Sequence, residues 1–243
     1  MLGSERSSDT DSPPAEWCEW EPTAMGLNVI MMGPPGAGKG TQASRFARER
    51  GLLKVSTGDI LRDAVKEMNP IALKAKTKMD RGELVDDDTM VAIVRHRLTQ
   101  PDALCGFVLD GFPRTVFQAR ALDVMMEDRR NGPLVIIDVS VPEDELVRRL
   151  ASRRICSNCG TGADPFGGLT TCKKCGGKLV PRVDDDQAVV LERLKVYQRA
   201  TKPVLEYYRL RPTFRTVNGA QAPEVVAREL DAMIEEAARA SIA

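Results

Sequence analysis

The residues with the clearest chemistry form a glycine-rich segment at 33–41, which reads GPPGAGKGT. It follows an apolar run at 27–32 and precedes a helix-like stretch at 41–49. This order is typical of a phosphate-binding loop, because glycines let backbone N–H groups close on a polyphosphate and a helix N-terminus favours negative charge. Lys39 is then expected to reach the outer phosphates. The hydroxyl lies at Thr41 rather than at position 40, so the hydroxyl that usually binds magnesium directly is missing or displaced.

Four cysteines in two Cys-x2-Cys pairs form a second chemical group. Twelve residues separate the pairs, and a glycine follows each of them. Four thiolates at this spacing suit a closed, tetrahedral structural zinc site. Disulfides are the alternative, and they are rare in cytosolic proteins. A zinc knuckle can also bind nucleic acid, but the insert holds a single aromatic residue for base stacking. The expected zinc ligands are Cys156, Cys159, Cys172 and Cys175.

The elements that must position these groups alternate between short apolar strands and amphipathic helices. The alternation predicts an α/β fold with a doubly wound five-stranded parallel sheet, which binds ligands outside the carboxyl ends of its strands. Residues 154–183 break the pattern, lack aliphatic periodicity and cannot build a core by packing alone. Strands are expected at 27–32, 52–55, 106–110, 134–139 and 214–217, and helices at 57–66, 70–81, 86–99, 115–128, 143–153, 185–211 and 223–240.

The bulk composition is that of an ordinary globular protein. The 243 residues are 42% apolar and 29% charged, with 35 basic and 35 acidic residues. The balanced charge gives no reason to expect nucleic acid or an anionic membrane as a partner, and no apolar run approaches the roughly 20 residues of a membrane span. Residues 1–25 read as a disordered extension with neither a secretion signal nor a transit peptide. We therefore expect a cytoplasmic protein. Cys18 and Cys105 follow no pairing pattern and are expected to be a tail thiol and a small core residue.

A third chemical segment is Asp-Gly-Phe-Pro-Arg at 110–114, whose carboxylate closes an expected strand and is placed to hold a magnesium-bound water. Together with segment 33–41, the Ser-Thr-Gly-Asp at 56–59 and the cysteine insert, it makes the chain resemble the adenylate kinase family, in its long-lid, zinc-containing bacterial type. The resemblance covers about residues 27–234. It also accounts for Gly40, since this family typically reads Gly-Lys-Gly-Thr.

The resemblance implies a P-loop nucleoside monophosphate kinase that reversibly transfers a phosphoryl group from MgATP to AMP, giving two ADP. It implies Mg²⁺ with the ATP, a structural Zn²⁺ in the lid, and ATP, AMP and ADP as partners of a monomer. It further implies two mobile insertions in a kinase domain at 26–243. These are an AMP-binding insertion at 56–85 and a zinc-binding lid at 154–186, with the core formed by 26–55, 86–153 and 187–243.

The resemblance also assigns site residues. Transfer to an already anionic phosphate needs alignment and charge neutralisation, and arginine binds phosphate oxygens with two donors. The acidic run 184–186 resembles a lid hinge that pairs with basic residues or orders metal-bound waters, and Asp185 suits a helix N-cap. The implied catalytic residues are Lys39, Asp110, Arg114, Arg153, Arg182 and Arg193. The implied ATP-binding residues are Gly36, Ala37, Gly38, Lys39, Gly40, Thr41, Arg149, Arg153 and Gln221. The implied AMP-binding residues are Thr57, Arg62, Gly111, Phe112, Arg114, Gln118, Arg182 and Arg193.

One departure from the family keeps an alternative open. Residues 161–164 read TGAD where zinc-type relatives usually carry a Tyr-His pair near the donor base, and the insert is shorter. A GTP-dependent AMP kinase is therefore the second reading. Pyrimidine monophosphate kinases normally have a short lid, which counts against them. An inactive nucleotide sensor or zinc-knuckle interaction protein would be expected to lack Lys39, Asp110 or the arginines, all of which are present.

Overall fold

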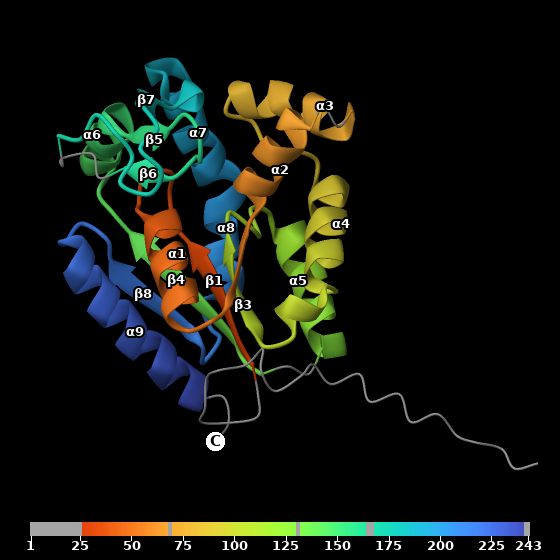
Figure 1. Ribbon diagram of the computed structural model, residues 1–243. Helices are drawn as coiled ribbons and strands as arrows, with labels where there is room; N and C mark the ends of the chain where they lie inside the picture. Colours follow the sequence, from red (N-terminus) through yellow and green to blue (C-terminus); the bar gives the residue numbers. More distant parts are fainter. Residues whose placement is uncertain (1–25, 68–69, 130–131, 164–167, 241–243) are drawn as a thin grey trace, which may run out of the picture.

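A five-stranded parallel sheet forms the centre of the computed structural model, which describes residues 26–67, 70–129, 132–163 and 168–240 (Figure 1). The central strand pairs on both sides, with Val29 beside Val108 on one neighbour and Val135 on the other. The order across the sheet is β2 (Leu53–Ser56), β3 (Gly106–Asp110), β1 (Leu27–Met32), β4 (Leu134–Ser140) and β8 (Phe214–Asn218). The α/β fold and the five strands expected from the sequence are confirmed.

Helices cover both faces of this sheet (Figure 1). Successive side chains of a strand point to opposite faces, so Val29 and Met31 pack in one apolar cluster and Ile30 and Met32 in the other. The first cluster includes residues of α1 (Lys39–Glu49), α6 (Glu143–Ser152), α7 (Gln187–Val196) and α9 (Pro223–Ala240). The second includes residues of α2 (Thr57–Lys66), α3 (Pro70–Asp80), α4 (Asp87–Leu98), α5 (Val116–Arg129) and α8 (Lys202–Tyr208).

The single long helix expected at 185–211 is wrong in its interior. The chain instead forms α7, a π-helical turn at Tyr197–Thr201, and α8. Pro203 lacks the backbone N–H that an α-helix would direct at residue 199, and the wider π turn is one way to accommodate that loss. The other expected helices begin and end within about two residues of their observed bounds.

Strands within 154–163 and 168–181 form a second, smaller sheet that the sequence pattern did not predict. Its antiparallel strands lie in the order β6 (Gly162–Ala163), β5 (Arg154–Cys156) and β7 (Leu179–Pro181). Figure 1 shows this sheet and helices α2 and α3 above the same end of the large sheet. Because its strands are only two or three residues long, packing between them buries little apolar surface.

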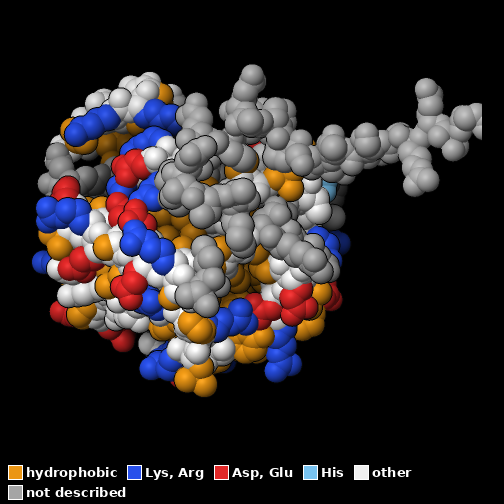
Figure 2. All heavy atoms as spheres, turned by 90° about the horizontal axis from the view of Figure 1, so that it is seen from below, with side chains coloured by type: hydrophobic (Ala, Val, Ile, Leu, Met, Phe, Trp, Pro, Cys, Tyr) orange, Lys and Arg blue, Asp and Glu red, His pale blue; other side chains and the backbone are white. Residues whose placement is uncertain are grey.

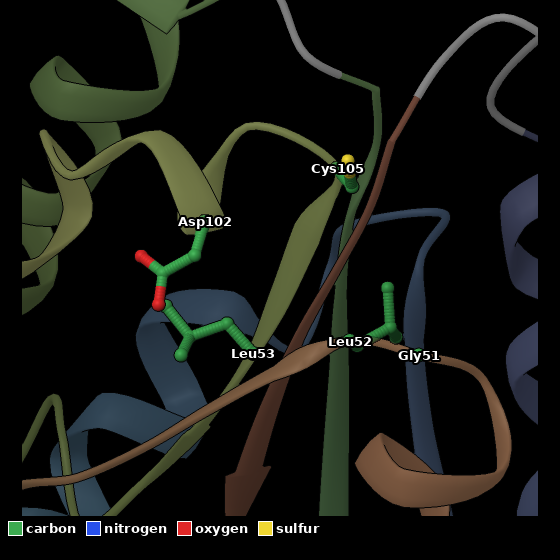
Figure 3. Close-up of a pocket in the computed structure, with 5 residues that line it drawn as sticks. All are labelled: Gly51, Leu52, Leu53, Asp102 and Cys105. Carbon is green, nitrogen blue, oxygen red and sulfur yellow. The ribbon is translucent and has the colours of Figure 1, made fainter. Parts of the chain in front are cut away.

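Cys105 differs from its expectation as an unpaired core residue, because it is disulfide-bonded. Chain spacing does not reveal which thiols meet in space. Cys18 and the extension at 1–25 lie outside the described residues. Cys105 also lines a pocket with Gly51, Leu52, Leu53 and Asp102 (Figure 3). This pocket lies where β2 and β3 begin, at the opposite end of the sheet from the glycine-rich loop.

The surface carries both signs of charge. On the face shown in Figure 2, the basic and acidic side chains that are described lie interspersed. Among the described residues, no helix combines the length and apolar character that a membrane crossing requires.

Candidate active site at the carboxyl ends of the strands

The glycine-rich loop joins the end of β1 to the start of α1, as the sequence predicts. Gly38 is the N-cap of α1 and has a φ of 92°, a left-handed conformation that favours glycine. At Gly33 an added Cβ would lie 2.4 Å from the carbonyl oxygen of Val139, so the loop backbone rests directly on β4. The N-terminus of α1 therefore opens at the carboxyl end of the sheet, where its unpaired N–H groups suit a phosphate.

Lys39, the first residue of α1, folds back over this loop. Its Nζ donates a hydrogen bond of 2.7 Å to the carbonyl oxygen of Pro34. Burial lowers the pKa of Lys39 to about 8, and the charges of Arg114, Arg193 and Arg153 add to that lowering while Asp110 opposes it. Lys39, Asp110 and these three arginines, all assigned by resemblance, are therefore electrostatic neighbours.

The Asp110 carboxylate lies directly against position 40. Asp110 ends β3 and pairs in register with Met31 at the end of β1. A Cβ added at Gly40 would lie only 3.1 Å from Asp110 Oδ2. A side chain at this position would require the carboxylate to move by a few tenths of an ångström. The missing hydroxyl thus leaves room for a carboxylate oxygen, which is a ligand type that Mg²⁺ accepts directly or through water.

Three of the expected catalytic arginines meet at the acidic run 184–186, which the resemblance assigns to a lid hinge. Arg153 donates two hydrogen bonds to the Asp185 carboxylate, of 2.6 and 2.5 Å, and Arg193 donates a third of 3.0 Å. Arg182 donates to Asp184 at 2.7 Å. Burial lowers the pKa of Arg193 to about 10, against the opposing charge of Asp184. The expected pairing of the hinge with basic residues is confirmed.

The expectation that Asp185 caps the following helix is wrong. The N-cap of α7 is Asp186, whose carboxylate accepts a hydrogen bond of 3.0 Å from the backbone N–H of Ala188. Asp185 instead ends a 3-10 turn at Val183–Asp185 with its carboxylate held by Arg153. A bidentate arginine pair is a stronger attraction than a cap to a backbone N–H.

Arg149 and Gln221 both contact the backbone at the end of β8, at residues 218–219. Arg149 donates 2.8 Å to the carbonyl oxygen of Gly219 and 2.6 Å to Glu145. Gln221 donates to the carbonyl oxygen of Asn218 at 3.2 Å. The spacing of four residues between Arg149 and Arg153 suggests one helix face and a common ligand, but Arg153 is the C-cap of α6 with extended backbone. The two guanidinium groups have different partners, so the structure does not bring them onto one group.

The residues assigned to AMP gather where β2 and β3 end. The Thr57 hydroxyl and Arg114 Nε both donate to the carbonyl oxygen of Gly111, at 3.0 and 2.8 Å. Gln118 lies beside them and accepts a hydrogen bond of 2.7 Å from the backbone N–H of Arg114. Arg62, one helical turn along α2, pairs with Asp59. Phe112 is buried and precedes a cis peptide bond to Pro113.

The four cysteines of the insert converge on one point, as the zinc prediction requires. Their sulfurs all lie within 4.8 Å of one another, with 3.4 Å between Cys156 and Cys175 and 3.7 Å between Cys159 and Cys172. Four sulfurs at about 2.3 Å from a tetrahedral Zn²⁺ would be about 3.8 Å apart. An added Cβ at Gly177 would lie 2.8 Å from Cys156 Sγ, so glycine is needed there for close approach. The donor set fits Zn²⁺.

Two carboxylates near the site were missed by sequence reasoning. Asp138 lies in β4 beside Met32, and its Oδ1 is buried with no hydrogen-bond partner within the described ranges. Burial raises the pKa of this carboxyl. The sequence signal that could have marked Asp138 was a single acidic residue inside an otherwise apolar strand. Asp87 accepts hydrogen bonds from Thr115 and Gln118. It stands in an acidic run that reads as an ordinary helix start, so no sequence signal marks it.

Comparison with known proteins gives one consistent result. A family model described as Adenylate kinase matches residues 31–212. A protein of Archaeoglobus fulgidus named Adenylate kinase is 45% identical over 214 residues, which cover 86% of this chain and 99% of the relative. Proteins of the same name from Syntrophobacter fumaroxidans and Methanocella arvoryzae are each 42% identical, over 86% and 87% of this chain and the whole of each relative.

Proposed function

The chain belongs to the adenylate kinase family, and from this premise we propose how its own residues move a phosphoryl group from MgATP to AMP to give two ADP. The protein is a nucleoside monophosphate kinase, so both substrates carry phosphates and both must be gripped by positive charge. The observation that best supports the residue roles below is the cluster of Lys39, Asp110 and three arginines between the glycine-rich loop and the acidic hinge.

We assign the donor phosphates to the loop at 33–41 and the first turn of α1. Lys39 would exchange its hydrogen bond to Pro34 for one to an outer phosphate oxygen, a better acceptor because it is charged. Asp110 and the space left by Gly40 suit Mg²⁺, which would shield phosphate charge and align the transferring group. Arg149 and Gln221, anchored beside Gly219, are placed to contact the rest of the donor nucleotide.

We assign AMP, the phosphoryl acceptor, to the residues around the carbonyl group of Gly111. Arg114 and Arg62 would bind the AMP phosphate, and Thr57 and Gln118 would contact its base. Because the attacking oxygen is already anionic, no residue has to remove a proton. Arg153, Arg182 and Arg193 would leave Asp184 and Asp185 for the transferring phosphoryl group, whose oxygens accept the same bidentate hydrogen bonds.

We further propose that residues 56–85 and 154–186 move as two flaps over the acceptor and the donor. Closure would exclude water from the transfer. Cys156, Cys159, Cys172 and Cys175 would hold a Zn²⁺ whose binding energy replaces the apolar core that the small sheet lacks. We propose that the enzyme works as a cytoplasmic monomer, which cell fractionation and sedimentation would test.

A substrate panel tests these assignments, crossing four nucleoside triphosphates with four monophosphates in a coupled assay. We expect AMP to be phosphorylated well above GMP, CMP and UMP, and ATP to be preferred over GTP as donor. Lys39→Met should abolish turnover while leaving the zinc content unchanged. Turnover with AMP no higher than with CMP or UMP would refute the acceptor assignment, and a preference for GTP would refute the donor assignment.

A further inference from the structure

Both polar atoms of the Gln118 side-chain amide are held by hydrogen bonds. An acceptor binds its nitrogen, and a donor binds its oxygen. Its Nε2 donates 2.8 Å to Asp87 Oδ1, and its Oε1 accepts 2.7 Å from the backbone N–H of Arg114. A carboxylate only accepts and a backbone N–H only donates. Both contacts therefore require the same orientation of the amide. Gln118 is 2% exposed, so water does not compete for either contact.

Asp87 is itself fixed in place. It lies in the first turn of α4, next to the N-cap Asp86. Its second carboxylate oxygen accepts a hydrogen bond of 3.0 Å from the Thr115 hydroxyl, which in turn accepts 3.2 Å from the backbone N–H of Gln118. Helix α4 lies alongside α5 in Figure 1, so one carboxylate spans the two helices. The Gln118 amide cannot rotate by half a turn without breaking its contacts to both Asp87 and Arg114.

The fixed orientation has a consequence for which base the site accepts. One hydrogen of Nε2 and one lone pair of Oε1 are used by Asp87 and Arg114, which leaves one donor and one acceptor in a fixed order. The edge of adenine offers a donor at N6 and an acceptor at N1, which match that pair. Hypoxanthine and guanine reverse the order, with an acceptor at O6 and a donor at N1.

We propose that Asp87 is a specificity-determining residue for the monophosphate site, which holds the Gln118 amide in the orientation that accepts a 6-aminopurine and rejects a 6-oxopurine. The inference rests on the proposed function, in which Gln118 contacts the AMP base. Asp87 is a positioning residue, since it acts through Gln118. A site that holds a fixed donor and acceptor rejects a reversed pair strongly, because both of its polar groups are then left unmatched.

Inosine monophosphate is the sharpest probe, because it differs from AMP in this edge and adds no exocyclic group. The test measures kcat/KM for AMP and for IMP at saturating MgATP. In Asp87→Ala only the backbone N–H of Arg114 still fixes the amide, so its rotation costs less free energy, and we expect the AMP-to-IMP ratio to fall by about ten- to hundred-fold. Asp88→Ala is the matched control, because it removes the same charge from the same turn of α4. Its ratio should stay within about twofold of that of the unaltered protein.

Two further variants separate the amide lock from general damage to the fold. Asp87→Asn keeps an oxygen acceptor for Gln118 and should keep the ratio. Thr115→Val removes the hydroxyl that fixes Asp87 and should lower the ratio in the same direction by a smaller factor. Thermal unfolding of each variant checks that it is folded, and Thr115→Val supplies the test if Asp87→Ala is not.

The outcomes are distinguishable. An unaltered protein that does not prefer AMP to IMP refutes the role of Gln118 in the proposed function, and the inference fails with it. A protein that prefers AMP, with a ratio unchanged in Asp87→Ala and Thr115→Val, refutes the inference alone. A ratio that falls equally in Asp88→Ala also refutes it, because loss of helix charge would then be the cause.

Discussion

Replacing Asp185 by alanine should destabilise the free protein and make its stability unusually responsive to phosphate. The Asp185 side chain is 4% exposed, while Arg153 and Arg193, which pair with it, are 24% and 18% exposed. The substitution leaves two arginines close together with no common carboxylate. Breaking a fully buried pair costs about 3–5 kcal/mol. Because water reaches about a fifth of each arginine, we expect a smaller loss of about 2–3 kcal/mol in the free energy of unfolding.

For a chain of this length, that loss corresponds to a fall in Tm of about 4–12 °C. Differential scanning calorimetry with and without inorganic phosphate measures both effects. Phosphate should raise the Tm of Asp185→Ala more than that of the unaltered protein, because it no longer competes with the carboxylate for the arginines. Asp186→Ala is the control. It removes the N-cap of α7, at a cost of about 1 kcal/mol, and should show no additional response to phosphate.

The reasoning is refuted if Asp185→Ala unfolds at the temperature of the unaltered protein, or if phosphate raises both Tm values equally. The first result would mean that solvent already compensates the charges. The second result would mean that the Asp185 carboxylate does not occupy a site at Arg153 and Arg193 that phosphate can bind.

Three more predictions concern the loop, the insert and β4. The pKa of Lys39 is lowered to about 8 chiefly by burial, so Lys39 of the free enzyme should lose its ammonium charge as the pH rises past 8. We therefore expect kcat/KM for ATP to fall above this pH. A flat profile of kcat/KM from pH 7 to 10 would contradict this. Metal analysis of freshly purified, reduced protein should find one zinc per chain. A weak chelator that leaves zinc in the unaltered protein should remove it from Cys172→Ser. Equal retention of zinc by the two proteins would exclude Cys172 as a ligand. Burial raises the pKa of Asp138 above its unfolded value of about 3.8, so its ionisation costs stability that is fully present only below that pH. Asp138→Asn should therefore unfold at a higher urea concentration than the unaltered protein at pH 7 but not at pH 3, and a loss of stability at pH 7 would refute the sign.

The parts of the fold that the sequence predicted are those set by local pattern. The apolar run at 27–32 and the glycines after it determine a buried strand and a tight turn whatever the rest of the chain does. Helix α2 is a similar case. The Ser56 hydroxyl accepts a hydrogen bond from the backbone N–H of Asp59, so the start of this helix is encoded within four residues. The spacing of the four cysteines likewise predicts that their sulfurs converge, without information from the rest of the chain.

The parts that could not be predicted depend on contacts between residues far apart in the chain. Whether Asp185 or Asp186 caps α7 is decided by Arg153, 32 residues away. The orientation of Gln118 is fixed jointly by the nearby backbone N–H of Arg114 and by Asp87, 31 residues away, which looks like any acid in the first turn of a helix. The π turn at Tyr197–Thr201 lies just before Pro203 and is one way to accommodate it, but proline can also kink or end a helix. Pattern alone does not choose among these outcomes.

The contact between Gly33 and Val139 determines where entropy is lost on binding. The loop backbone is held against β4 by the sheet itself, so nucleotide binding does not have to order it. In the insert, the described strands β5, β6 and β7 are only two or three residues long and form a sheet separate from the large one. Most of the conformational entropy lost on donor binding should therefore come from that insert. With the proposed Zn²⁺ bound, its removal by a chelator should make the calorimetric binding entropy for ATP more unfavourable. The binding entropy for pyrophosphate, which needs only the loop, should stay largely unchanged.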